Sequence, residues 1–277
     1  MSIRILCKEE FDLKAELLKM EGTIPRGYFS ASQFTKYLNC GESYRYHYEK
    51  SIYSPPSEKM AIGSVGHELV ELHIKSQLET KLIPEADTIL ESLNSIFSAV
   101  FSKVPEKARE LSTEALLDII KNIYTCWYKE VSSELSPVSS EETAYFLLDD
   151  MWPIMAKLDY INLDEEGRLE IVDLKVGKML RDPKNSLQLG IYSLSKGINR
   201  VSYDTLLLPG KRTGARRKKE GTTLSEEQLG HIESVLSTAA RGIAAKIYLK
   251  TTPDFWGCSL KYCSAYERCR GEVNKHG

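Results

Sequence analysis

The chain has 277 residues, of which 42% are hydrophobic and 27% charged, and its formal net charge is -2 at pH 7. This composition is that of an ordinary globular protein and excludes disordered and fibrous classes. A net charge near zero gives no global attraction to polyanions, so nucleic-acid binding would require local basic clusters and metal ions. Residues 1–22 lack a signal-peptide pattern and no run is apolar enough for a membrane helix, so we expect a cytoplasmic protein without a membrane partner.

Helical patterns dominate the first half of the chain. Aromatic residues between Gln33 and Glu49 recur at helical spacings after Ser30, which predicts capped helices around Cys40. Residues 62–78 predict the next helix, with His67 in its first turns. Residues 85–133 predict a helical hairpin that serves packing or forms a subdomain.

The pattern changes to short apolar runs after Pro137. Residues 143–148, 152–163 and 168–176 predict successive antiparallel strands. A helix over 183–195, a strand over 201–208, a basic loop and a long helix over 225–249 follow. The chain is therefore expected to mix helices with a sheet that begins as hairpins.

One hairpin is predicted to bring two carboxylates together. Asp164-Glu165-Glu166-Gly167 separates two of the strands, and glycine at the end of such a loop is a recurrent hairpin closure. With Asp164 opposite Arg168, Asp159 falls opposite Asp173. Like charges facing each other destabilise a sheet unless something neutralises them, and a divalent cation would do so.

Lys175 follows Asp173 by two residues, so strand periodicity places both side chains on one face. Oxygen ligands suit Mg²⁺ or Mn²⁺, which orients a water, lowers its pKa and stabilises charge on a phosphate under attack. The alternative is an ordinary solvated strand face. The strand is apolar almost throughout, which favours a central strand, and central strands seldom carry such charges without a role.

The residues around these positions resemble a known family. Residues 156–161 (Ala-Lys-Leu-Asp-Tyr-Ile) and 171–177 (Ile-Val-Asp-Leu-Lys-Val-Gly) are similar to the metal-binding hairpin of the PD-(D/E)XK nucleases, in the branch of RecB-like nuclease domains and CRISPR-associated exonucleases. The second acid is Asp rather than Glu, which that branch tolerates. His67 in Gly63-Ser64-Val65-Gly66-His67-Glu68, and Gln188 and Tyr192 in Gln188-Leu189-Gly190-Ile191-Tyr192, match the same branch.

This resemblance covers most of the chain from Ser30 onward and carries expectations for fold and site. It implies an α/β (α+β) fold with a restriction-endonuclease-like core, in which helices flank a mixed central sheet, with a helical insertion. It implies that His67, Asp159, Asp173 and the backbone carbonyl of Leu174 bind Mg²⁺ or Mn²⁺. The catalytic residues it implies are Asp159, Asp173, Lys175, Gln188 and Tyr192, of which the last two contact DNA or support the site.

Four of the six cysteines form a candidate metal site. Cys258, Cys263 and Cys269 crowd the C-terminal region and lack only a fourth ligand, which Cys40 would supply. In the same nuclease branch one early cysteine and three C-terminal ones hold a [4Fe-4S] cluster, although the first spacing here is four residues rather than two. Zinc and reduced thiols without metal remain the alternatives. Such a clasp would act structurally, by constraining the unfolded chain.

One strongly basic stretch is a candidate DNA contact. Residues 211–219 lack large apolar side chains and contain a glycine, which predicts a mobile loop. Charge runs are usually just solvated, but this one follows a strand expected beside the active-site sheet. The candidate DNA-binding side chains are Lys211, Arg212, Arg216, Arg217, Lys218 and Lys219.

We therefore expect a single nuclease domain over residues 1–277. Within it, residues 28–80 carry the N-terminal helices with Cys40 and His67, residues 85–135 a helical subdomain, residues 140–250 the catalytic sheet and helices, and residues 251–277 the cysteine-rich clasp. The expected function is a metal-dependent DNA exonuclease acting on single strands or free ends. By resemblance it would serve recombination, repair or CRISPR adaptation, with a helicase or recombination partner and a possible homo-oligomeric state.

Two other functions remain open from the sequence. The first is a catalytically silent DNA-binding or assembly subunit, which the intact acids, Lys175 and His67 argue against. The second is an iron–sulfur or zinc interaction protein whose hairpin is merely structural. It predicts metal at the cysteines without dependence on Mg²⁺ or Mn²⁺.

Overall fold

The computed structural model describes residues 3–210 and 214–270 and builds a mixed α/β fold. The N-terminal elements are β1 (Ile3–Leu6), α1 (Lys8–Met20), β2 (Phe29–Ser30), α2 (Ala31–Asn39), α3 (Gly41–Tyr44) and the π-helical turn η1 (Arg45–Glu49). The helical region comprises α4 (Glu58–Thr80), α5 (Ala86–Leu90), α6 (Leu93–Phe101), the 3-10 turn η2 (Glu106–Ala108) and α7 (Thr113–Val131).

The second half of the chain supplies most of the strands. They are β3 (Pro137–Ser140), β4 (Thr143–Leu148), β5 (Trp152–Lys157), β6 (Tyr160–Leu163), β7 (Leu169–Gly177), β8 (Arg200–Leu207) and β9 (Arg216–Thr223). Between and after them lie α8 (Leu187–Lys196), α9 (Glu226–Ala244) and α10 (Tyr266–Arg270). The helices around Cys40, the helical hairpin and the strand over residues 143–148 are confirmed, but the Ser30 side chain does not cap α2, whereas Cys40 caps α3.

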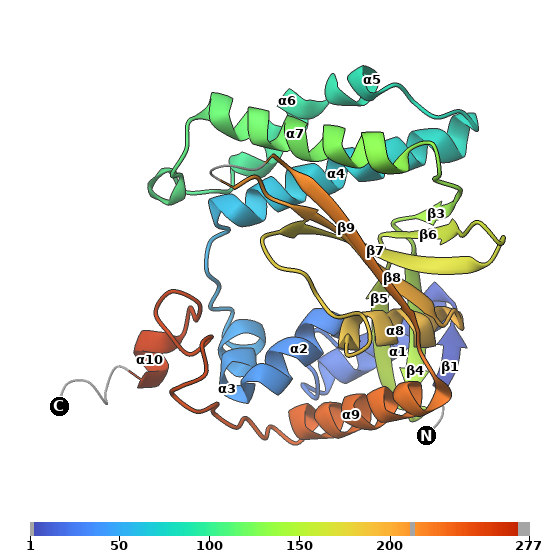
Figure 1. Ribbon diagram of the computed structural model, residues 1–277. Helices are drawn as coiled ribbons and strands as arrows, with labels where there is room; N and C mark the ends of the chain where they lie inside the picture. Colours follow the sequence, from blue (N-terminus) through green and yellow to red (C-terminus); the bar gives the residue numbers. More distant parts are fainter. Residues whose placement is uncertain (1–2, 211–213, 271–277) are drawn as a thin grey trace.

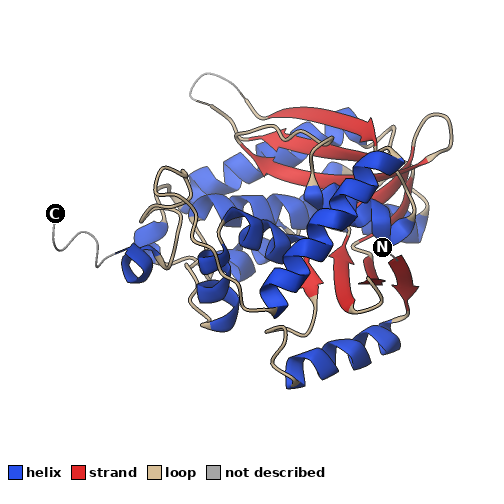
Figure 2. Ribbon diagram, turned by 90° about the horizontal axis from the view of Figure 1, so that it is seen from below, coloured by secondary structure: helices blue, strands red, loops and turns tan. Residues whose placement is uncertain are grey.

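The strands form two mixed sheets, and helices flank both (Figures 1 and 2). One sheet has the order β1-β4-β5-β2 and the other β3-β6-β7-β8-β9. In the second sheet β7 lies in the middle and pairs in parallel with β8, so the prediction of a central strand is confirmed. The restriction-endonuclease-like class is also confirmed, with the central sheet divided in two.

The predicted single strand over residues 152–163 is wrong. β5 ends at Lys157 in one sheet and β6 begins at Tyr160 in the other, so the chain changes sheets between them. The segment between β3 and β4 also passes from one sheet to the other. Backbone bonds from Glu141 to Asp159 and from Leu158 to Glu142, both 2.8 Å, hold the two crossings together. Buried Leu158 fits an apolar strand pattern, which is why the break was missed.

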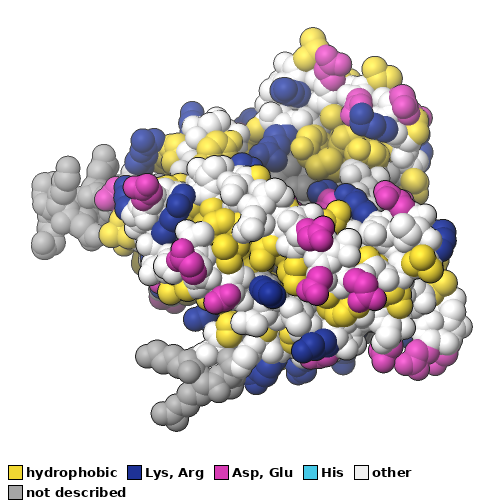
Figure 3. Space-filling view, turned by 90° about the horizontal axis from the view of Figure 1, so that it is seen from above, with side chains coloured by type: hydrophobic (Ala, Val, Ile, Leu, Met, Phe, Trp, Pro, Cys, Tyr) yellow, Lys and Arg dark blue, Asp and Glu magenta, His cyan; other side chains and the backbone are white. Residues whose placement is uncertain are grey.

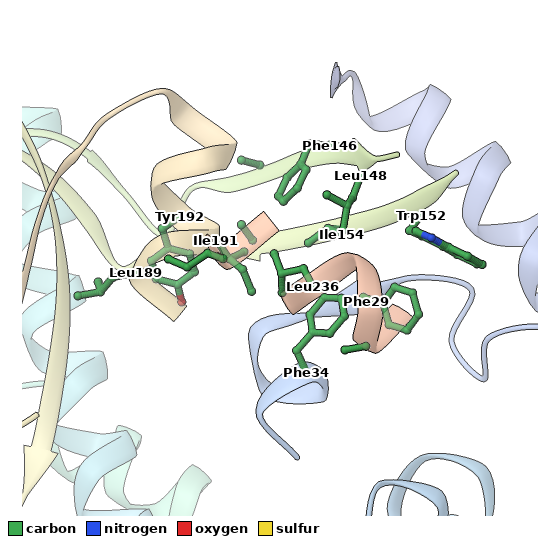
Figure 4. Close-up of a cluster of buried hydrophobic side chains, with 14 of the residues drawn as sticks. Phe29, Phe34, Phe146, Leu148, Trp152, Ile154, Leu189, Ile191, Tyr192 and Leu236 are labelled. Carbon is green, nitrogen blue, oxygen red and sulfur yellow. The ribbon is translucent and has the colours of Figure 1, made fainter. Parts of the chain in front are cut away.

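Two hydrophobic cores lie on opposite faces of the second sheet, and the first of them also covers the first sheet. Buried side chains of α2, α8 and α9 pack on the first sheet, and Figure 4 shows Phe29, Phe146 and Leu236 within this cluster. The opposite face of the second sheet packs against α4 and α7, and α6 packs on these two helices. Trp127, Ile120 and Leu69 are fully buried there. Burying such side chains stabilises each by about 1.5–3 kcal/mol, which fixes α4 and α8 on either side of β7.

Several predicted boundaries shift. α8 begins at Leu187, capped by Ser186, because residues 183–186 form a turn. α9 ends at Ala244 rather than near residue 249, and the following segment is held by a bond from Tyr37 Oη to the Ile247 carbonyl, 2.8 Å. β1 and α1 were not anticipated. No helix in residues 3–210 and 214–270 is long and apolar enough to cross a membrane.

Candidate active site

The predicted hairpin register is confirmed. Tyr160 pairs with Val172 and Leu163 with Leu169, which places Asp159 just beyond the last pair and beside Asp173. At the other end Gly167 closes the loop with a φ of 73°, a left-handed conformation that glycine adopts without steric cost. The loop thus sets the register that brings the two aspartates together.

Asp159 lies where the chain passes from one sheet to the other. Its Oδ2 accepts a hydrogen bond from the Leu174 N–H at 2.7 Å and lies 2.9 Å from His67 Nε2. These contacts attach one carboxylate to both β7 and α4. Burial opposes a charged His67, yet the hydrogen bond and charge of Asp159, with the charge of Asp173, raise the His67 pKa.

Asp173 has no solvent exposure in the middle of the central strand. Its carboxylate contacts the Lys175 ammonium, and within the described residues neither oxygen accepts a hydrogen bond of normal geometry. Burial, followed by the negative charge of Asp159, raises the pKa of Asp173 to about 6. A buried acid beside a second acid leaves negative charge that a divalent cation would neutralise.

Two further predicted residues reach the same place from α8. Gln188 Nε2 donates to Tyr192 Oη at 2.7 Å, so the pair shares one helix face as expected. Burial and the nearby charge of Asp173 raise the Tyr192 pKa, which keeps its hydroxyl protonated. Tyr192 also belongs to the buried cluster in Figure 4, which anchors its ring.

Glu71 and Glu141 were missed by the sequence analysis. His67, Glu71 and Glu141 each offer a ligand atom, and these three atoms lie within 4.8 Å of one another. Glu71 follows His67 by one helical turn, a spacing that could have indicated it. Glu141 comes from the crossing between β3 and β4, where no local pattern marks it. Lys75 and Lys157 form ion pairs with these two acids.

Tyr203 is a further residue on this face of the sheet. It pairs with Asp173 across the parallel strands β7 and β8, and the Lys175 Nζ lies 5.7 Å from its ring centroid. Tyr203 Oη and Ser186 Oγ are hydrogen bonded at 2.5 Å. The Tyr203 ring therefore lies next to Lys175 on the face of the sheet that carries Asp173.

The predicted basic loop is only partly a loop. Lys211 and Arg212 lie outside the described residues, whereas Arg216, Arg217, Lys218 and Lys219 belong to β9, which pairs antiparallel with β8. The expectation of a mobile loop over residues 216–219 is wrong. The backbone of these residues pairs with β8, and an edge strand tolerates charged side chains.

Strand periodicity divides these four basic residues between two faces. Lys218 pairs with Thr205, which in turn pairs with Lys175, so Lys218 lies on the face of the sheet that carries Asp173. Arg216 is two residues away and shares that face. Arg217 instead bonds the fully buried Asp204 at 2.7 Å, and Lys219 bonds Glu170 at 2.5 Å.

Comparison with known proteins shows to which family the chain belongs. The model of the PD-(D/E)XK nuclease superfamily matches residues 28–270. The chain belongs to this superfamily. No curated protein matches it. One solved structure, "Crystal structure of SSO0001", is similar with 11% identity and a TM-score of 0.40, covering 94% of each chain.

Membership in this nuclease superfamily indicates phosphodiester hydrolysis, and its members typically use Mg²⁺ or Mn²⁺. The donor set here is imidazole plus carboxylate oxygens, which suits these ions. The buried Asp173 carboxylate, which lacks a normal hydrogen bond among the described residues, also fits a cation ligand. The residues present therefore fit the expected metal.

The four candidate cysteines line one cavity of about 220 Å³. Cys40 caps α3, and Cys258, Cys263 and Cys269 come from the clasp at the other end of the chain. In the described part of the chain, no three of their sulfur atoms lie within 4.8 Å of one another. A tetrahedral zinc site needs sulfurs about 3.8 Å apart, so the thiols are not arranged as a compact zinc site.

Proposed function

We propose that this chain is a metal-dependent deoxyribonuclease that acts as an exonuclease on single strands or DNA ends. The observation that supports it most is the convergence of His67, Asp159, Asp173 and Lys175 from α4, a sheet crossing and the central strand. A structural charge network would not need two acids beside each other at a buried position.

His67, Asp159, Asp173 and the Leu174 carbonyl would hold the Mg²⁺ or Mn²⁺ ion. When bound, the ion supplies a polarised water at neutral pH and stabilises negative charge on the phosphate. The Lys175 ammonium, which contacts the Asp173 carboxylate, would position the water or the phosphate. Tyr192 keeps its proton and, with Gln188, offers donors at the α8 side of the site.

DNA contact by β9 extends this proposal. Arg216 and Lys218 are exposed and share the face of Asp173 and Lys175, so both would bind backbone phosphates near the scissile bond. Figure 3 shows basic and acidic side chains interspersed on the face seen from above, without a broad basic field there. Local contacts of this kind fit a chain whose net charge is -2. Lys211 and Arg212 stay candidates for the same role.

The clasp would hold a [4Fe-4S] cluster between Cys40, Cys258, Cys263 and Cys269. The shared cavity of about 220 Å³ that all four cysteines line supports a common metal site there, and the resemblance of the cysteine pattern favours the cluster. Its role would be structural. Service in recombination, repair or CRISPR adaptation, alongside a helicase or recombination partner, would follow from the resemblance to RecB-like nuclease domains and CRISPR-associated exonucleases.

The first test is degradation of end-labelled single-stranded and duplex DNA with Mn²⁺, Mg²⁺ or EDTA. We expect metal-dependent shortening from an end, reduced on the order of 10²–10³-fold in Asp173→Ala and in Lys175→Ala. The matched controls, Glu165→Ala and Lys121→Ala, remove exposed charges and should retain activity.

Three outcomes would count against the proposal. Equal degradation by wild type and both active-site variants would identify a contaminating nuclease. Binding without cleavage by metal-loaded wild type would favour the silent DNA-binding subunit. Internal cuts throughout the substrate would contradict exonuclease action while leaving the hydrolytic site intact.

A further inference from the structure

Exposed aromatic side chains gather on the clasp, where they line the cavity of the four candidate cysteines, apart from the site around Asp159 and Asp173. Trp256 is 69% exposed and Tyr262 is 55% exposed, and their ring centroids lie 5.2 Å apart in an edge-to-face arrangement. Apolar rings of this size are normally buried, so a pair exposed together requires an explanation. Together these two residues are called the aromatic platform.

The surroundings of the platform are basic although the whole chain is slightly acidic. Residues 250–270 contain four basic side chains, Lys250, Lys261, Arg268 and Arg270, and two acidic ones, Asp254 and Glu267. Lys261 Nζ lies 5.1 Å from the Tyr262 ring centroid. Exposed rings among lysines and arginines are the combination that binds single-stranded nucleic acid, because bases stack on rings while cations neutralise phosphates.

The surface beside His67 is hollowed along the first turns of α4. A depression of about 460 Å³ beside His67 is lined by Lys59, Met60, Gly63, Ser64 and Val176, so it follows the first turns of α4. Residues 50–57 lead from the start of α4 back toward the clasp. There the Ser264 hydroxyl donates to the Ile52 carbonyl at 3.2 Å. Figure 1 shows this connection passing beside the clasp.

The chemistry of this depression suits one unpaired strand. Lys59 offers a cation, Met60 is 64% exposed, and Gly63 leaves the helix surface low where a backbone would pass. A duplex presents no free base faces for stacking, whereas an unpaired strand does. The exposed ring pair is therefore suited to stacking on bases, and the depression beside His67 is suited to a strand backbone.

We propose that Trp256 and Tyr262 form a stacking site for single-stranded DNA, from which the strand follows the first turns of α4 to His67. This inference rests on the proposed nuclease function for the identity of the nucleic acid. It assigns the clasp a role in substrate binding in addition to its structural one.

The tryptophans offer a direct measurement. Trp127 and Trp152 are buried, at 0% and 6% exposure, so a strand that stacks on the protein quenches mainly Trp256 fluorescence. We expect oligo(dT) to quench wild-type emission in EDTA. In Trp256→Phe the quenching should disappear while affinity, measured by fluorescence anisotropy of a labelled strand, is retained, because phenylalanine still stacks.

Affinity measurements complete the test. Trp256→Ala and Tyr262→Ala should each weaken oligo(dT) binding roughly 5- to 150-fold, the range measured for loss of one stacked base. Leu13→Ala, which trims an exposed apolar residue on α1, is the matched control and should leave affinity unchanged. The metal content of each variant shows whether the clasp remains folded.

The failures are distinguishable. Unchanged affinity in both alanine variants would overturn the stacking site, whatever the nuclease assay shows. An equal loss of duplex affinity would overturn the assignment to single strands. Absence of cleavage by wild type, with Trp256-dependent binding intact, would contradict the proposed nuclease function and leave this inference standing.

Discussion

At the scale of single residues, the site depends on burial of charge. Asp173 has no solvent exposure, and burial with the charge of Asp159 raises its pKa to about 6. A raised acid pKa means that the folded protein binds a proton more tightly than the unfolded chain does. Its contribution to stability is present below the unfolded pKa of about 3.9 and is lost as pH rises through about 6.

Asp173→Asn should therefore stabilise the metal-free protein at neutral pH. We expect a gain on the order of 1 kcal/mol in the free energy of unfolding at pH 7 in EDTA, measured with urea, because the amide carries no buried charge. The same variant should lose the rise in melting temperature that Mn²⁺ gives the wild type. A wild-type Mn²⁺ shift that persists in Asp173→Asn would show that the ion binds elsewhere.

The same pKa predicts how metal binding depends on pH. Protons compete with the cation for Asp173, so the Mn²⁺-induced rise in melting temperature should shrink as pH falls from 7 to 5. Scanning calorimetry at fixed free Mn²⁺ measures it. A shift of constant size over this range would indicate that Asp173 is not a ligand.

At the scale of elements, β9 shows how one strand serves two purposes. Its alternate side chains point to opposite faces, so Arg217 and Lys219 pair with buried acids while Arg216 and Lys218 face the catalytic side. Composition marks all four as equivalent basic residues. Only the pairing with β8 distinguishes them.

This division predicts that substitutions at adjacent residues affect different properties, stability at Arg217 and DNA binding at Lys218. Arg217→Ala leaves the buried Asp204 without its ion-pair partner and should cost about 3–5 kcal/mol in the free energy of unfolding. Lys218→Ala should leave stability unchanged and weaken DNA binding at low salt, by the loss of about one phosphate contact. Urea unfolding and salt-dependent anisotropy measure the two effects.

Matched controls sharpen this comparison. Asp204→Asn combined with Arg217→Ala should recover part of the lost stability, because no charge then remains unpaired. If Lys218→Ala destabilised the fold as strongly as Arg217→Ala, the assignment of faces would be contradicted.

At the scale of the whole molecule, the clasp joins the two ends of the fold. Cys40 near the start and three cysteines near the end line the same cavity, and the Glu42 N–H donates to the Leu249 carbonyl at 3.3 Å beside it. A bound metal group there would restrict most of the unfolded chain, which stabilises the folded state.

Cys40→Ser should therefore release the metal and lower the melting temperature. Cys7→Ser is the matched control, because Cys7 is exposed and does not line this cavity, and it should retain both the metal and the melting temperature. Elemental analysis for iron and zinc, with visible absorbance, identifies the bound group. Full iron content in Cys40→Ser would exclude Cys40 as a ligand.

The sequence by itself determined the parts of the site that depend on short-range geometry. The hairpin loop set the register of Asp159 and Asp173, the period of two placed Lys175 beside Asp173, and the four-residue spacing aligned Gln188 with Tyr192. These relations follow from backbone geometry over a few residues, so they needed no knowledge of distant segments.

Only the tertiary structure decided what distant segments do to one another. The crossings between sheets brought Glu141 to Asp159, the pairing of β9 with β8 separated Arg217 from Lys218, and packing of the chain ends placed Cys40 by the C-terminal cysteines. The physical reason is that such contacts are set by burial and packing across the whole chain, and the local pattern of hydrophobicity is the same with or without them.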